Sequence, residues 1–106
     1  SNAVFRHPLG KKWFALVMDI PKSRLGEKDE SVVDVVNLKC PPSLVSSFCQ
    51  DNGIYHAYHM NKANWISVVL ADADDDEIKT LTDISFNLTI KKLAKNKIEN
   101  ENKGTL

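Results

Sequence analysis

The chain lacks the features that mark a membrane protein or a disulfide-rich secreted protein. Its longest unbroken apolar run, Trp13–Met18, is far too short to cross a membrane. Its two cysteines, Cys40 and Cys49, have neither the spacing of zinc ligands nor that of a disulfide framework. We interpret both as reduced thiols of a cytoplasmic protein, because that compartment keeps thiols reduced.

Net charge is also absent, since 14 Lys and Arg balance 14 Asp and Glu. This balance argues against a protein that binds nucleic acid mainly by bulk electrostatics, because such domains are usually strongly basic. Residues 1–66 carry a small excess of basic side chains, and residues 67–106 carry a small excess of acidic ones. A local basic face therefore remains compatible with the composition.

The 106 residues suit one small domain, which we place at residues 4–93. Ser1-Asn2-Ala3 is typical of the remnant of a cleaved expression tag, and the polar residues 94–106 are typical of a disordered tail. Because Val4 stands inside an apparent strand, we expect that an N-terminal segment is missing or that this is one domain of a longer protein.

Four segments have the apolar, β-branched composition of strands. A turn after the first and a polar loop over residues 21–31 after the second join three of them into two hairpins. Both hairpin tips carry basic side chains. The predicted strands are Val4–Arg6, Trp13–Ile20, Val32–Leu38 and Trp65–Leu70; residues 54–64 are interpreted as a loop.

Two helices complete the pattern. Pro42 suits the first turn of one helix, and Asn52-Gly53 marks its end. Asp74 and Glu77 have the spacing of a capping box at the start of the other, which continues to Leu93 with a candidate break at residues 85–87. The expected buried faces are Leu44, Val45, Phe48 and Cys49 in the first helix, and Ile78, Leu81, Ser85 and Leu88 in the second. The order β-β-β-α-β-α predicts an α+β domain: a twisted antiparallel sheet with helices packed on one face.

The densest group of functional side chains is YHMNKAN, residues 58–64, just before the last strand. In a binding site, Lys62 would contact a phosphate, Asn61 or Asn64 would offer donors and acceptors, and His59 or Tyr58 would stack on a base. In a structural role, the two asparagines would fasten a tight loop through its own backbone, and His59 would be a buried ring. Both interpretations stay open, and the sequence favours the structural one.

The basic hairpin tips form a second candidate site. As two wings they would straddle a duplex, each cation contacting one phosphate and adding the salt dependence of about one counterion. The alternative is ordinary solvated charge, offset by Glu27, Asp29 and Glu30 in the second tip. The basic residues in question are Arg6, His7, Lys11, Lys12, Lys22, Arg24 and Lys39.

Metal binding and catalysis have weaker support. His56 and His59 are three residues apart, but the segment is interpreted as a loop rather than a helix. The acidic run at residues 72–77 offers oxygen ligands for a hard cation, yet helix capping and the helix dipole already explain it. Cys40 has no recognisable oxyanion loop. We therefore expect no metal, no cofactor and no enzymatic activity.

Several sequence blocks, in order, resemble the MmcQ/YjbR family of small bacterial proteins. They are VFRHP, KKWFALVMDIPKSRLG, VDVVNLKC, AYHMNKANWISVVL and DDEI…L…S…LT, and YHMNK-x-NW is the most specific of them. The resemblance covers Val4 to about Leu93. It implies a CyaY-like (frataxin-like) α+β fold, and members usually begin with a helix and a strand that this chain lacks. Pro41 stands where members usually have Asp. The family carries a proposed DNA-binding role through paired hairpin wings.

We therefore expect a non-enzymatic cytoplasmic binding protein whose partner is DNA. The alternative is a protein-interaction or regulatory module with no nucleic-acid contact, which the zero net charge favours. The oligomeric state and the identity of the ligand are left open by the sequence. The residues expected to contact DNA are Arg6, Lys11, Lys12, Lys22, Arg24, Lys39, His59, Asn61 and Lys62.

Overall fold

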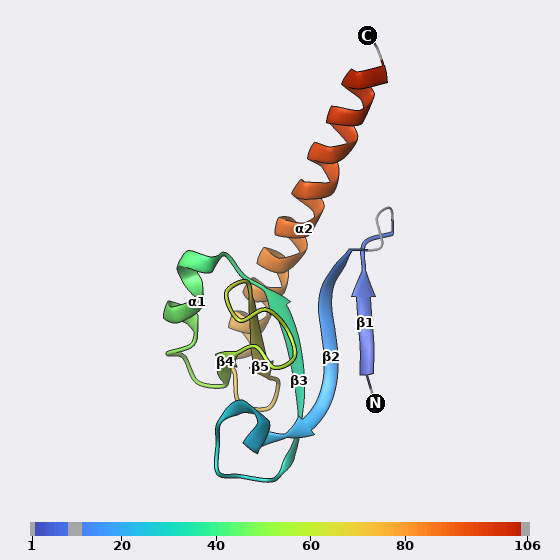
Figure 1. The fold of residues 1–106 in the computed structure, drawn as a ribbon. Helices are drawn as coiled ribbons and strands as arrows, with labels where there is room; N and C mark the ends of the chain where they lie inside the picture. Colours follow the sequence, from blue (N-terminus) through green and yellow to red (C-terminus); the bar gives the residue numbers. More distant parts are fainter. Residues whose placement is uncertain (1, 9–11, 105–106) are drawn as a thin grey trace.

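The computed structural model describes residues 2–8 and 12–104, with side chains up to residue 90. A 5-stranded sheet in the order β1-β2-β3-β5-β4, antiparallel at every pairing, is packed against helices (Figure 1). Its strands are β1 Asn2–Arg6, β2 Trp13–Pro21, β3 Val32–Lys39, β4 Ile54–His56 and β5 Trp65–Val69. The helices are the short 3-10 helix η1 Lys22–Leu25, α1 Pro42–Phe48 and α2 Asp75–Gly104. The α+β class predicted from the sequence is confirmed.

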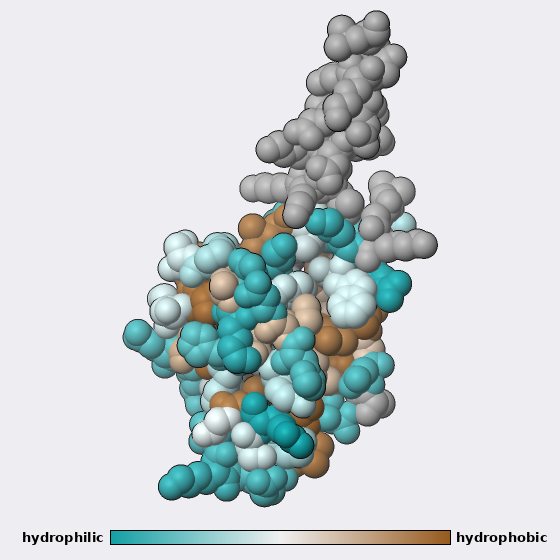
Figure 2. Space-filling view, viewed as in Figure 1, coloured by the Kyte–Doolittle hydropathy of each residue, from teal (hydrophilic) through white to brown (hydrophobic). Residues whose placement is uncertain are grey.

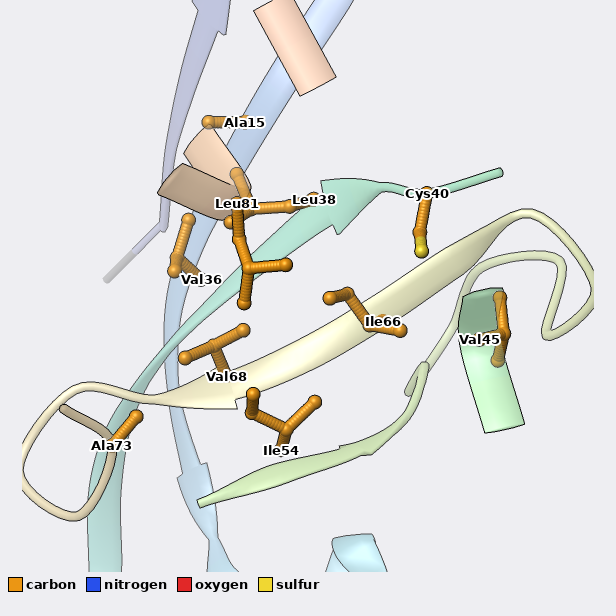
Figure 3. Packing of buried hydrophobic residues seen from close by; sticks show 10 residues of the cluster. All are labelled: Ala15, Val36, Leu38, Cys40, Val45, Ile54, Ile66, Val68, Ala73 and Leu81. Atoms are coloured by element: carbon orange, nitrogen blue, oxygen red, sulfur yellow. The ribbon is translucent and has the colours of Figure 1, made fainter. Parts of the chain in front are cut away.

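The main core lies between one face of the sheet and the two α-helices. Leu38 of β3 and Ile66 of β5 are fully buried and pack with Leu81 of α2 and Val45 of α1 (Figure 3). Both helices therefore cover the same face of the sheet, as predicted. We call this the helix face.

Loops cover much of the opposite face, which we call the loop face. Met18, Val35 and Val69 are buried there, and Leu25 of η1 and Tyr58 pack over them. In Figure 1 the segment that follows β4 lies in front of the sheet and α2 lies behind it. Because both faces are covered, β2 and β3 carry apolar residues in runs rather than in alternation.

Two details of the first helix and its surroundings differ from the prediction. Strand β4 falls in a segment predicted as loop; it has three residues, too few for a period-2 pattern to show. Helix α1 ends at Phe48, and of its expected apolar face only Val45 is buried, while Leu44 is 40% exposed. A seven-residue helix makes only two turns, so it presents little surface to the sheet.

Helix α2 is continuous where a break was expected at residues 85–87. Ser85 is fully buried, donates a hydrogen bond to the Phe14 carbonyl (2.5 Å) and accepts one from the Lys39 N–H (2.9 Å). Its hydroxyl therefore ties the helix to two strands instead of interrupting it. The predicted cap is confirmed, since the Glu77 N–H donates to Asp74 Oδ2 at 3.1 Å.

Both ends of the predicted domain also differ in extent. Asn2 and Ala3, assigned to a tag remnant, pair with Met18 and Val17 in the sheet. The backbone of α2 is helical past Leu93, as far as Gly104. The side chains from residue 91 onward lie outside the described residues, so the disordered tail stays a prediction. No helix in the described part of the chain is long and apolar enough to cross a membrane.

We predict that Gly53→Ala destabilises the domain far more than Gly26→Ala. Both glycines have positive φ, 79° and 94°, so alanine costs about 1–2 kcal/mol at either site. At Gly53 the added Cβ would also lie 2.6 Å from the Ala73 nitrogen, whereas at Gly26 nothing lies within 4 Å. Urea denaturation should show a loss of about 3 kcal/mol or more for Gly53→Ala. Equal losses at the two glycines would contradict the close approach of the backbone at Gly53 to the backbone at Ala73.

Candidate functional site

The loop at residues 57–64 is fastened to the loop face by a buried polar network. Asn37 and Ser67 are register partners on β3 and β5, and both are fully buried. Asn37 Nδ2 donates to the Tyr58 carbonyl (2.8 Å), the Ser67 hydroxyl donates to Asn37 Oδ1 (2.5 Å), and the Tyr58 N–H donates to Ser67 Oγ (2.9 Å). The network holds the loop in one position, because breaking it would leave buried polar groups unpaired.

Inside the loop, the structural interpretation holds for some residues and fails for His59. Asn61 Oδ1 accepts a hydrogen bond from the Ala63 N–H at 2.8 Å, as expected of a loop-fastening asparagine. The ammonium group of Lys62 donates to the Ala57 carbonyl at 2.7 Å, so it closes the loop. His59 is exposed rather than buried; its φ is 61°, and its ring centroid lies 4.0 Å from that of Tyr58.

The two basic hairpin tips cannot act together as a pair of wings. Both hairpins share β2, and in an antiparallel sheet consecutive hairpins turn at opposite ends. Strand β2 has nine residues, so roughly 30 Å separates its two ends, from which the two hairpins turn. We call the end where β1 ends and β2 begins the hairpin end of the sheet, and the end that carries η1 the η1 end (Figure 1).

At the η1 end the cations stand among carboxylates. Lys22 pairs with Asp72 at 2.9 Å, and this hydrogen bond raises the pKa of Lys22. Arg24 is exposed on η1, next to a loop that contains Glu27 and Glu30. Strand β2 ends, β3 begins, β5 ends and α2 begins at this end. Its carboxylates are therefore Asp19, Glu27, Asp29, Glu30, Asp34, Asp51, Asp72, Asp74, Asp75, Asp76 and Glu77.

The hairpin end instead brings cations together with both tryptophans of the chain. The Arg6 guanidinium carbon lies 5.5 Å from the ring centroid of Trp13, its register partner, and Trp13 is 38% exposed. Lys39 and the half-buried Trp65 are register partners on β3 and β5, so their side chains are neighbours on one face. The face is the loop face, because Lys39 and Trp65 alternate with the buried Leu38 and Ile66 of the helix face.

A β-bulge turns Trp13 toward the same face. Phe5 pairs with Ala15 but Arg6 pairs with Trp13, so Phe14 is an extra residue in β2. Phe14 points to the helix face, where its ring lies 5.1 Å from that of Phe86. The tryptophans were not among the predicted site residues, since an aromatic at a strand start is also typical of the core. Only the register shows which face each one occupies.

The remaining predicted cations of the hairpin end divide into three cases. Lys12 is half-buried, and its carbonyl accepts the His7 N–H at 2.9 Å, which closes the hairpin. His7 itself is buried, hydrogen-bonded to Thr89, with its ring 4.4 Å from that of Phe86. Its place in the basic site was therefore wrong. Lys11 lies outside the described residues.

An apolar groove of 230 Å³ opens on the helix face beside the edge strand β1. Phe5, 50% exposed, stands at one side of it, and Ile78 and Thr82 of α2 stand at the other. On the loop side of the molecule, drawn in Figure 2, brown hydrophobic residues show only as small areas between hydrophilic ones. The two sides of the sheet thus offer surfaces of different chemistry.

The candidate metal ligands and the candidate nucleophile are not assembled into sites. No group of three or more His, Cys, Asp or Glu among the described residues is placed to hold a metal ion. Cys40 is buried and Cys49 half-buried, and burial raises the pKa of both thiols. A raised pKa leaves little thiolate near neutral pH, so neither group is activated as a nucleophile.

We predict that Glu77→Gln stabilises the domain at neutral pH. The hydrogen bond that Glu77 shares with Asp51, then burial and the nearby charges of Asp51 and Asp74, raise the pKa of Glu77 from 4.5 to about 6. The folded state thus binds this proton more tightly than the unfolded chain, so stability falls as pH rises through the window from 4.5 to about 6.

Gln keeps a hydrogen-bond donor without the charge. Thermal unfolding should therefore show a higher Tm for Glu77→Gln than for the unsubstituted protein at about pH 7, and no difference at about pH 4. Asp83→Asn, which removes an exposed carboxylate of α2 beyond its first two turns, serves as the control. A lower Tm for Glu77→Gln at both pH values would contradict the raised pKa of Glu77.

Comparisons with known proteins agree with this fold. The family model described as YjbR matches residues 1–88. An "Uncharacterized protein YyaQ" from Bacillus subtilis (strain 168) is 40% identical over 90 residues, which are 84% of this chain and 76% of that protein. A crystal structure of a Pseudomonas syringae protein is similar, with a TM-score of 0.80 and 48% identity over 83% of this chain and 76% of that one.

A solution NMR structure from Pseudomonas syringae gives a TM-score of 0.74, again at 48% identity, over 83% of this chain and 71% of that one. The family match spans most of the chain, and the identity to the Bacillus subtilis relative extends over most of both proteins. The chain therefore belongs to the YjbR family.

Proposed function

We propose that this domain is a non-enzymatic cytoplasmic protein that binds DNA at the hairpin end of the sheet. The observation that carries the proposal is the separation of charge within a neutral chain. The described carboxylates gather mainly at the η1 end, whereas Arg6, Lys12, Lys39 and Lys62 stand at the hairpin end. The free cysteines support a reducing compartment.

The zero net charge does not oppose such binding. The Debye length is about 8 Å at physiological ionic strength, and the two ends of β2 are roughly 30 Å apart. A phosphate held at the hairpin end is therefore largely screened from the carboxylates at the η1 end. The local cations decide the interaction, and each one that contacts a phosphate releases about one counterion.

The contacts fall into two groups. Arg6 and Lys39 stand on the sheet itself, so their positions are set by strand register, and they supply phosphate contacts. His59 and Asn61 stand on the fastened loop, where the Asn61 carbonyl accepts the Trp65 N–H, and they supply polar or stacking contacts to bases. Lys62 already donates one hydrogen bond within the loop and keeps two N–H groups for a phosphate.

A protein-interaction module is the second candidate function. The apolar groove beside Phe5 favours it, because exposed apolar surface next to an unpaired edge strand is typical of protein contacts. The groove lies on the helix face and the proposed DNA site on the loop face. Substitutions in the two places therefore test the two functions separately.

We predict that the double variant Arg6→Gln, Lys39→Gln binds a short DNA more weakly and with less salt dependence. Removing two phosphate contacts should reduce the slope of log K against log salt by about 2. Gel-shift titrations at about 50 mM and about 200 mM salt measure this slope.

The matched control is Arg24→Gln, Lys28→Gln, which removes two exposed cations at the η1 end. It should bind as the unsubstituted protein does. A control that loses as much affinity as the test variant would place the contacts elsewhere, and no binding by the unsubstituted protein even at the lower salt would refute the DNA proposal.

A further inference from the structure

We infer that the DNA held at the hairpin end is single-stranded, with unpaired bases stacked on Trp13 and Trp65. This inference rests on the proposed function and specifies the form of DNA that the same surface takes. Its basis is the way in which four neighbouring strands each place one side chain on the loop face at this end. In the order of the strands these are Arg6, Trp13, Lys39 and Trp65, so cations and indole rings alternate.

The two rings are placed to receive separate bases. Trp13 is on β2 and Trp65 is on β5, with β3 between them, so two strand spacings, roughly 10 Å, separate their backbones. Lys39 occupies the intervening strand and can reach a phosphate between the two bases. Arg6 on β1 holds its guanidinium carbon 5.5 Å from the centroid of the Trp13 ring, so it covers part of that ring and can contact a second phosphate beside it. The row thus offers alternating contacts for the alternating bases and phosphates of one strand.

The small number of cations also favours a single strand. A protein that binds a duplex mainly through its backbone needs many phosphate contacts, and this face offers few. Stacking on aromatic rings contributes binding free energy without added charge, and each base must be unpaired to expose its face to a side chain. A neutral chain with two tryptophans in one row fits that mode.

The geometry of the hairpins removes the main route to duplex binding. Tips that straddle a duplex must project from the same side, whereas these two stand at opposite ends of β2. At the η1 end, Lys22 is already paired with Asp72. On the same loop face, the fastened loop at residues 57–64 adds the rings of Tyr58 and His59, 4.0 Å apart, and the exposed His59 ring is a place for a further base.

Tryptophan fluorescence provides a direct test, because both tryptophans of the chain lie in this row. The full chain is titrated with an oligothymidylate of roughly 10 nucleotides, within the usual site size of single-strand-binding folds. The same titration is made with a duplex of that length and with an abasic strand. Fluorescence anisotropy of labelled strands gives the affinities. We expect quenching and the tightest binding with the oligothymidylate, and neither with the abasic strand.

Substitutions then separate stacking from folding. Trp13→Leu should weaken binding of the oligothymidylate about tenfold, and Trp13→Phe should restore most of that loss, since phenylalanine keeps a stacking face. Circular dichroism and the Tm verify that each variant is folded. If Trp13→Leu fails this test, Trp13→Phe and Arg6→Gln still report through quenching and affinity. Arg24→Gln is the control and should change nothing.

The possible outcomes distinguish this inference from the proposed function. A duplex that binds as tightly as the single strand, without quenching, overturns single-strand binding and leaves DNA binding intact. An abasic strand that binds as well as the oligothymidylate overturns stacking in the same way. If none of the three ligands binds at low salt, the inference and the proposed function both fail.

Discussion

Antiparallel pairing on both sides of β2 is the constraint on which the remaining arrangement depends. Because β2 is shared by two hairpins, their tips turn at opposite ends, and every later element is placed relative to that axis. The loop after β5 and the start of α2 bring carboxylates to the η1 end, while the starts of β2 and β5 bring the tryptophans to the hairpin end. A chain with no net charge thereby acquires two ends of different electrostatic character.

The second face of the sheet depends on one buried asparagine. Asn37 has no exposed surface and bonds both Ser67 and the backbone of Tyr58, so the loop at residues 57–64 replaces a helix as the cover of that face. A polar network in a low-dielectric interior is stable only when each member is satisfied, and this one is closed by the Tyr58 N–H. The loop is thus held in place by the domain itself, without a ligand.

Much of the fold and part of the site could be predicted from the sequence. The apolar runs of β2, β3 and β5 and the cap at Asp74 are local signals, and each is present in the structure. Strand β4 and the continuity of α2 at Ser85 escaped prediction because they depend on partners distant in sequence. The role of Asn61 in the loop followed from its short side chain, whereas the exposure of His59 depends on a positive φ that the residue type does not reveal.

The sequence by itself determined the α+β class, the family resemblance and the balance of charge, since these follow from composition, periodicity and short motifs. Only the tertiary structure decided which charges stand together. Strand register, and above all the extra residue at Phe14, sets whether a side chain meets the helices or the open face, and a shift of one residue reverses that choice. For this reason Lys22 and Arg6, equivalent as basic tip residues in the sequence, have different roles in the folded domain: one pairs with Asp72, and the other lies over Trp13.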